Sequence, residues 1–338
     1  MLSLLLFAAG VLAAPLEKRQ APSGVPDFAL TYAPVAYLYS KEAYYPADIG
    51  SQLVNTQPQA NYTPISNLSS RPLSLDNLDQ LNAYGRGGQD VYLTSKDNVE
   101  DIPAWLRGAK PDSNGLTNGA VSSTVIVNNH GSGMVDVFYF YFYAFNFGGK
   151  YISHVIGNHV GDWEHTMVRF KDGKPQAIWY SQHSNGEAFE YRVVKKYNNG
   201  ARPVVYIGNG THANYAIPGD HDHAIPNVNL PQGLVEDHTD QGAFWDPIQS
   251  AYWFSFNASS QIFTSYDGST RTNWLYYVGH WGDKQYRDSD PRQKDILDID
   301  GSHKYTNGPT GPINKQLNRT KVCPDNGNLC IVRAILGP

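Results

Sequence analysis

The sequence predicts a mainly β protein, an antiparallel β-sandwich with long functional loops. Runs rich in β-branched and aromatic residues recur along the chain, separated by turn dipeptides such as Asp172-Gly173 and Asn199-Gly200. The chain contains 23 Tyr and 7 Trp, a content typical of rings that pack in pairs across neighbouring strands. We find no internal repeat and no long heptad pattern, so a helical architecture is not indicated.

The N-terminal part of the chain is expected to be irregular. Residues 28–49 predict a short strand, a polar turn at residues 40–42 and an aromatic exit. Residues 50–100 are rich in Asn, Gln, Pro and Ser, and only residues 75–81 show a weak helical pattern. We therefore expect a long ordered loop region there.

The middle of the chain carries the strongest strand signals. Residues 120–128 are β-branched, and after the turn at residues 130–133 the run VDVFYFYFYAFNF follows. Its continuous apolar character predicts a strand covered on both faces, as in the centre of a sandwich. Further strands are expected at residues 162–170, 176–180, 189–194 and 203–207, and aromatic stretches follow at 251–256 and 273–282.

The first 19 residues predict a signal peptide and a short propeptide. Their apolar run is too short to span a bilayer, and the dibasic pair Lys18-Arg19 ends the segment. Residues 20–338 are then expected to form a single secreted β-sandwich domain without a transmembrane segment. The formal net charge of −5 gives no indication of a nucleic-acid partner, and nothing in the sequence indicates the oligomeric state.

Export agrees with two further features. Cys323 and Cys330 are the two cysteines, and in an oxidising compartment they are expected to form a disulfide. The chain also contains five N-glycosylation sequons, and glycosylation is expected at four of them, Asn61, Asn67, Asn257 and Asn318. The fifth, at Asn209, lies inside a candidate site, which a glycan would obstruct.

The main candidate site lies in the segment GNHVGDWEHTMVRF, residues 157–170. Asp162 and Glu164 are two positions apart, so on a strand they project from one face and can bind one cation. His159 is the expected third ligand, whereas Trp163 and His165 point the opposite way. Such ligands suit Ca²⁺, Mg²⁺ or Mn²⁺, or Zn²⁺ if a second histidine joins. In the alternative interpretation, the two acids belong to the solvated face of a strand.

Three other clusters carry polar chemistry. In YIGNGTHANY, residues 206–215, a strand runs into a turn that presents Thr211 and His212; His212 is a metal ligand, a general base or a packing histidine. GDHDH, residues 219–223, is a metal-binding loop or a flexible polar loop. The segment VEDHTDQGAFWDP is a candidate to complete the same pocket through Asp237, His238, Asp240, Trp245 and Asp246.

Several of these motifs together resemble the fungal family named for vacuolar protein sorting-associated protein 62. They are APVAYLYSKEAYYPADI, VGDWEHTMVRF, GNGTHANY and VGHWGD with the following GPTGP. The resemblance implies a role linked to protein delivery to the vacuole, which becomes the alternative destination to secretion. It assigns no reaction.

A more distant resemblance is to the necrosis-inducing toxins of plant pathogens. Those are secreted β-sandwich proteins whose GHRHDWE motif holds a divalent cation and which engage sphingolipid head groups. The matching stretch here is HVGDWE. The resemblance places Asp162 and Glu164 on the acidic ligands and His159 on the first histidine, whereas Gly161 replaces the second histidine. Another residue, such as His212, would have to complete the shell.

Together these features lead to one hypothesis and two alternatives. The leading hypothesis is a protein that binds a divalent cation and a glycan or lipid head group, with ligand contacts from Trp163, Thr211, Tyr215 and Trp245. The first alternative is a metal-dependent hydrolase of cell-wall polysaccharide or a phosphoester, with Glu164 or His212 as catalytic base. The second is a membrane-damaging toxin.

Overall fold

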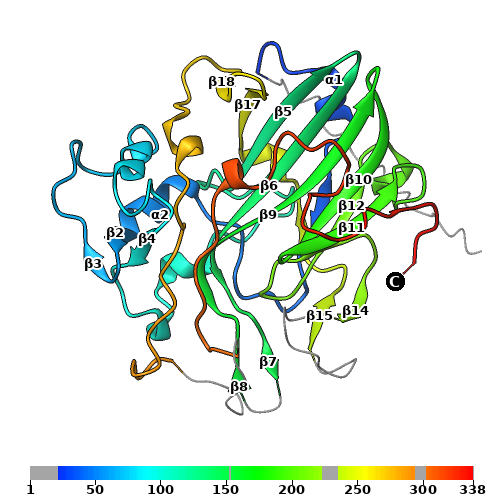
Figure 1. Ribbon diagram of the computed structural model, residues 1–338. Coiled ribbons are helices and arrows are strands. Elements are labelled where there is room, and N and C mark those ends of the chain that lie inside the picture. Colours follow the sequence, from blue (N-terminus) through cyan, green and yellow to red (C-terminus); the bar gives the residue numbers. More distant parts are fainter. Residues whose placement is uncertain (1–21, 152–153, 223–234, 294–301, 338) are drawn as a thin grey trace, which may run out of the picture.

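The computed structural model describes residues 22–151, 154–222, 235–293 and 302–337 (Figure 1). The predicted signal peptide and propeptide, residues 1–19, therefore lie outside the described residues, and so does His223 of the third cluster. Within the described chain, strands predominate and are arranged in several multi-stranded sheets, as predicted.

The centre of the protein is an eight-stranded sheet with the order β18-β17-β5-β6-β9-β10-β11-β19 (Figure 1). Its neighbours pair antiparallel except for β17 with β5 and β11 with β19, which pair parallel. The bounds are β5 Ser123–Gly131, β6 Met134–Asn146, β9 His159–Lys171, β10 Lys174–Gln182, β11 Asn185–Glu190, β17 Ala251–Asn257, β18 Ile262–Ser265 and β19 Val332–Arg333.

Both faces of this sheet are buried, which explains the continuous aromatic run on β6. Successive side chains of a strand point to opposite faces. Phe138, Phe140 and Phe142 therefore enter one core, whereas Tyr139, Tyr141 and Tyr143 enter the other.

The tyrosine face packs against a second sheet of four strands, β13-β12-β1-β16, and the two sheets form the sandwich. Ala36, Val205, Ile207 and Trp245 of the second sheet contribute to the shared core. The bounds are β1 Val35–Tyr37, β12 Val204–Ile207, β13 Asn214–Tyr215 and β16 Phe244–Trp245.

The phenylalanine face is covered by residues that the sequence assigned to a loop region. That prediction was incomplete, because this region forms helix α2 (Ile49–Asn55) and a small sheet with the order β3-β2-β4. The Asp48 side chain caps α2 by accepting the Ser51 amide. The other elements on this side are β2 Thr56–Ala60, β3 Thr63–Pro64, β4 Val91–Ser95, η1 Leu78–Ala83, η2 Val99–Asp101, η3 Ala104–Arg107, η6 Asn273–Tyr276 and η7 Pro312–Asn314.

One local prediction is confirmed and another needs correction. The short strand expected within residues 28–49 is β1, and helix α1 (Asp27–Thr31) precedes it, with Asp27 in its first turn. The third and fourth clusters were expected as loops, but they contribute the paired strands β14 (Gly219–Asp222) and β15 (Glu236–Thr239). The remaining elements are β7 Lys150–Tyr151, β8 His154–Val155, η4 Tyr197–Asn199 and η5 Pro247–Ser250.

The predicted disulfide between Cys323 and Cys330 is present. The asparagine of the Asn209 sequon is partly buried, whereas the four selected as glycosylation sites are exposed, which leaves their modification a prediction: Asn61, Asn67, Asn257 and Asn318. In the described part of the chain, no helix has the length and apolar character needed to cross a membrane.

Candidate functional site

The two predicted acids lie on the inner face of the central sheet. Strand β9 places Asp162 opposite Tyr143 of β6, with Glu164 next on the same face. As expected, Trp163 points the other way, where it packs against Phe142 and Trp281. Both carboxylates are almost completely buried, so their surroundings rather than solvent determine their charge.

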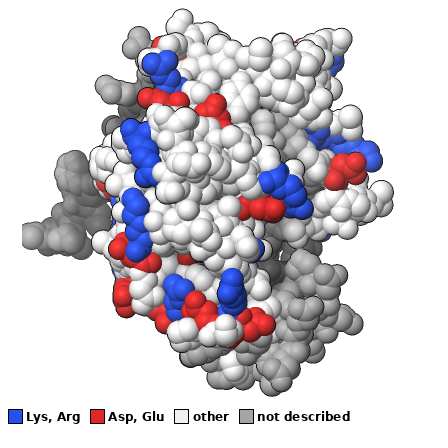
Figure 2. Space-filling model, turned by 60° about the vertical axis from the view of Figure 1, so that its left-hand side comes forward, with Lys and Arg blue, Asp and Glu red and all other residues white. Residues whose placement is uncertain are grey.

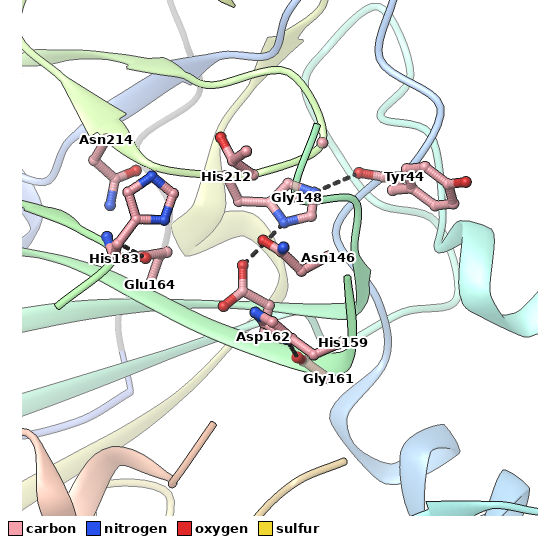
Figure 3. A network of polar contacts seen from close by, with 12 residues as sticks. Tyr44, Asn146, Gly148, His159, Gly161, Asp162, Glu164, His183, His212 and Asn214 are labelled. Atoms are coloured by element: carbon pink, nitrogen blue, oxygen red, sulfur yellow. Dashed lines mark hydrogen bonds and ion pairs between the residues drawn. The ribbon is translucent and has the colours of Figure 1, made fainter. Parts of the chain in front are cut away.

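Asp162 forms an ion pair with His212 (Figure 3). The His212 Nδ1 donates to the Asp162 carboxylate over 3.0 Å, and Nε2 donates to the Tyr44 carbonyl oxygen over 3.0 Å. Burial lowers the pKa of His212, but the hydrogen bond with Asp162 and the charge of Glu42 outweigh burial and raise it. The ring stacks on Tyr143 at 3.6 Å. His212 is therefore an imidazolium held on three sides.

The two acids differ in charge. Burial raises the pKa of Asp162, yet the hydrogen bond from His212 and the nearby positive charges of His212 and Lys315 bring it below its ordinary value. Burial and the neighbouring Asp162 charge raise the pKa of Glu164 to about 7. Glu164 accepts from the Ser181 hydroxyl and from the His183 amide at 3.1 Å. Near neutral pH, Asp162 is thus ionised while Glu164 exchanges a proton.

Asp237 forms a second centre beside this pair. Its carboxylate accepts from His183 Nε2 at 2.8 Å, from Thr211 Oγ1 at 2.6 Å and from the Tyr215 hydroxyl at 2.7 Å. Burial lowers the pKa of His183, but the Asp237 charge and hydrogen bond raise it to about 9. The hydroxyls of Thr211 and Tyr215, expected to contact a ligand, are therefore directed at Asp237.

Glu42 fixes the turn that carries His212. Its carboxylate accepts the Gly210 amide at 2.8 Å and the Tyr44 amide at 2.8 Å. His212 itself has φ +57, in the left-handed region that non-glycine residues seldom adopt. Such a conformation persists where the surrounding contacts hold it, and it is concentrated at functional sites.

His159, the predicted third ligand, is half-buried at the start of β9. Its Nδ1 hydrogen-bonds the Gly161 carbonyl oxygen at 2.7 Å, and burial holds its pKa below the ordinary value. Neutral His159 thus keeps Nε2 for a ligand. Among the described residues, however, the set whose ligand atoms all lie within 4.8 Å of one another is Asp220, Glu236 and His238, on the exposed β14–β15 hairpin. His159, Asp162 and Glu164 would need side-chain rotation to share an ion.

The remaining predicted residues do not gather at this site. Trp163 and Trp245 are 1% and 0% exposed, so neither presents a ring face to solvent. Asp240 accepts from Ser40, and Asp246 pairs with Arg202. Of the fourth cluster, Asp237 alone joins the network around Glu164 and His183.

Three site residues escaped the sequence analysis: Glu42, Tyr143 and His183. Glu42 was assigned to the polar turn at residues 40–42, and Tyr143 was assigned to the core. His183 follows β10, the strand that pairs with β9. The sequence offered one signal for His183: it directly follows the strand that was expected to lie next to the strand of the two acids.

Gly161 is required by the backbone. It has φ +69, and a Cβ at this position would lie 2.4 Å from the Trp281 carbonyl oxygen. The Gln52 side chain also donates to that oxygen, at 2.7 Å. A histidine cannot replace Gly161 without displacing the backbone of the segment that contains Trp281.

Fold and site together define a β-sandwich protein with a buried carboxylate–imidazole network on the inner face of its central sheet. The chain belongs to the family described as vacuolar protein sorting-associated protein 62, whose model matches residues 98–300. Two Saccharomyces cerevisiae relatives agree. The vacuolar protein sorting-associated protein TDA6 is 35% identical and covers 89% of this chain and 69% of its own. Vacuolar protein sorting-associated protein 62 is 33% identical and covers 88% and 68%. The family predicted from the motifs is confirmed.

Solved structures with some likeness include NLPPya in complex with mannosamine, at 14% identity and a TM-score of 0.30. The alignment covers 71% of this chain and 79% of that one. The non-toxic HaNLP3 protein matches at 12% identity and a TM-score of 0.27, over 69% and 74%. Scores this low carry no inference about the site.

Proposed function

We propose that this protein of the secretory pathway binds a divalent cation and a glycan or lipid head group at the network around Asp162 and Glu164. A concentration of buried carboxylates supports the proposal. The four are Glu42, Asp162, Glu164 and Asp237. His212 pairs with Asp162 and His183 pairs with Asp237, whereas among the described residues Glu42 and Glu164 form no ion pair.

Specific atoms are available to hold such an ion. In the described structure, Asp162 Oδ1 and His159 Nε2 make no hydrogen bond, and the buried Tyr143 hydroxyl has no partner. An oxygen-rich set with one imidazole suits Ca²⁺, Mg²⁺ or Mn²⁺. Zn²⁺ is less favoured, because both nitrogens of His212 are engaged. A cation with open coordination positions would offer them to sugar or head-group oxygens.

Calorimetric titration with Ca²⁺, Mg²⁺ and Mn²⁺ tests the cation. Asp162→Asn should abolish the binding heat, whereas Glu236→Gln, which disables the exposed hairpin set, should retain it. Because Glu164 has a pKa of about 7, affinity should fall about tenfold per pH unit below that value. Equal heats for the parent and Asp162→Asn would remove the cation from the proposal.

A binding screen against fungal and plant polysaccharides and sphingolipid vesicles, with and without chelator, tests the ligand. We expect the parent to bind one of these ligands and to lose that binding when chelator is added. Asp162→Asn should not bind the ligand under either condition. The relatives' names suggest a role in vacuolar protein sorting, so the destination is proposed as extracellular or, alternatively, vacuolar. Leakage of the vesicles would instead favour the membrane-damaging alternative.

The divergent pKa values of Asp162 and Glu164 favour one further candidate, hydrolysis. Two adjacent carboxyls, one ionised and one with a pKa of about 7, resemble the acid and base pairs of glycosidases. Glu164 is the better base than His212, which is already protonated. At a cation concentration high enough to keep the ligand bound, Glu164→Gln should then abolish the formation of product from a cleavable polysaccharide or phosphoester. If the parent forms no product from any of these substrates, the hydrolase candidate is refuted and the proposed function is ligand binding alone.

A further inference from the structure

A cavity of about 570 Å³ lies apart from the residues of the carboxylate–imidazole network. The small sheet β3-β2-β4 forms one wall, with Tyr62 in the turn between β2 and β3 and Thr94 on β4. Residues 283–292 form the other wall, with Lys284, Arg287 and Ser289. All the residues that line this cavity are described.

Two cations enter the cavity without an acidic partner. Lys284 Nζ and Arg287 Cζ each lie 4.7 Å from the centroid of the Tyr62 ring. The Tyr62 hydroxyl donates to the Gln285 carbonyl oxygen at 2.7 Å, which fixes the ring beneath both cations. Within the described ranges, neither Lys284 nor Arg287 forms an ion pair with a carboxylate.

The two acids of the cavity are already occupied. Asp290 pairs with Arg292 at 2.7 Å, and Arg292 in turn covers the Tyr286 ring at 3.8 Å. Asp283 is buried and accepts from the Ser95 amide at 2.6 Å and from the Tyr286 hydroxyl. Neither carboxylate is therefore directed at Lys284 or Arg287, so no described carboxylate of the cavity neutralises these two side chains.

Hydrogen-bond donors accompany this charge. Among the described residues, the hydroxyls of Thr94 and Ser289 make no hydrogen bond, and both line the cavity. The chain as a whole carries a net charge of −5. On the face in Figure 2, charged side chains stand mostly in small groups of mixed sign on an uncharged background. In this cavity, by contrast, Lys284 and Arg287 lie over one ring, that of Tyr62.

We propose that this cavity binds the phosphate group of a phosphomonoester. A phosphate dianion offers several acceptor oxygens, which match the guanidinium of Arg287, the ammonium of Lys284 and the free hydroxyls. The cavity has room for the sugar or inositol ring that carries the phosphate. The same chemistry is present in a soluble sugar phosphate and in a phosphorylated lipid head group. The proposal does not depend on the cation site.

Binding is measured by calorimetry with inorganic phosphate, glucose 6-phosphate and glucose, and by sedimentation with phosphatidylinositol 4-phosphate vesicles against phosphatidylcholine vesicles. The parent should bind at least one phosphorylated probe and neither unphosphorylated control. The double variant Lys284→Gln, Arg287→Gln should weaken that binding by at least about tenfold. Preference for glucose 6-phosphate or for the vesicles identifies the source of the phosphate.

Arg86→Gln is the matched control for Lys284→Gln, because each removes one cation, and Arg86 belongs to an exposed pair with Asp90 and does not line the cavity. It should leave binding unchanged. Lys284→Gln alone, with an intermediate loss, keeps the test valid if the double variant folds poorly. Absence of binding to every phosphorylated probe would overturn the proposal, as would equal affinity of the parent and a folded Lys284→Gln, Arg287→Gln protein.

Discussion

Replacing Gly161 with alanine tests whether this motif position is reserved for the backbone. Gly161 has φ +69, and a Cβ would stand 2.4 Å from the Trp281 carbonyl oxygen. The left-handed backbone costs an alanine about 1–2 kcal/mol, and the contact forces a shift that costs about 1–3 kcal/mol more. We therefore expect Gly161→Ala to lower the free energy of unfolding by about 2–5 kcal/mol.

Gly87→Ala isolates the contact. Gly87 also has φ +69, but a Cβ there has no atom within 4 Å. The backbone cost is then common to both variants, and the difference in urea-unfolding free energy should be about 1–3 kcal/mol. Equal losses in the two variants would refute the argument that the Trp281 segment excludes a side chain. Gly161→His, which places a larger side chain at the same position, should be destabilised at least as much as Gly161→Ala.

Three further predictions concern the network and the disulfide. His183 has a pKa raised to about 9, so its stabilisation is complete below pH 6.5 and is lost as pH rises through 9; relative to His183→Gln, the parent should lose up to about 3 kcal/mol of unfolding free energy over that range. Asp162→Asn removes the partner of His212, and NMR titration should show a lower pKa of His212 in the variant. An unchanged pKa would mean that Asp162 does not stabilise the protonated form of His212. Replacing Cys323 and Cys330 with serine opens a short loop and should cost about 2 kcal/mol in thermal unfolding, without changing cation binding.

The central sheet was predictable because its signals are local. Residues 135–147 are aromatic on both faces, and Asp172-Gly173 marks the hairpin between β9 and β10. Strand β2 carries no such signal. Its sequence TQPQA is polar and contains Pro58, yet it pairs with β4 over five residues, Thr56–Ala60. That pairing is determined by the core beneath it, which residue-by-residue propensity does not describe.

The spacing of Asp162 and Glu164 correctly predicted that they share a face, because strand alternation is a local rule. It did not reveal which groups would surround them. His212 is 50 residues from Asp162, and the third contact of its ring, Tyr143, comes from β6. These contacts, which are distant in sequence, determine which of the two acids is ionised, and the charge of each acid determines whether it can bind a cation or transfer a proton.

The same contacts change which residue suits acid–base chemistry. From sequence, Glu164 and His212 were equal candidates for a base. In the fold, His212 donates through both nitrogens to Asp162 and Tyr44, so no lone pair remains to accept a proton. Burial, together with the charge of Asp162 that His212 stabilises, raises the pKa of Glu164 to about 7. In the hydrolysis proposed above, Glu164 is therefore the group that would carry the proton, and His212 would act on it only through Asp162.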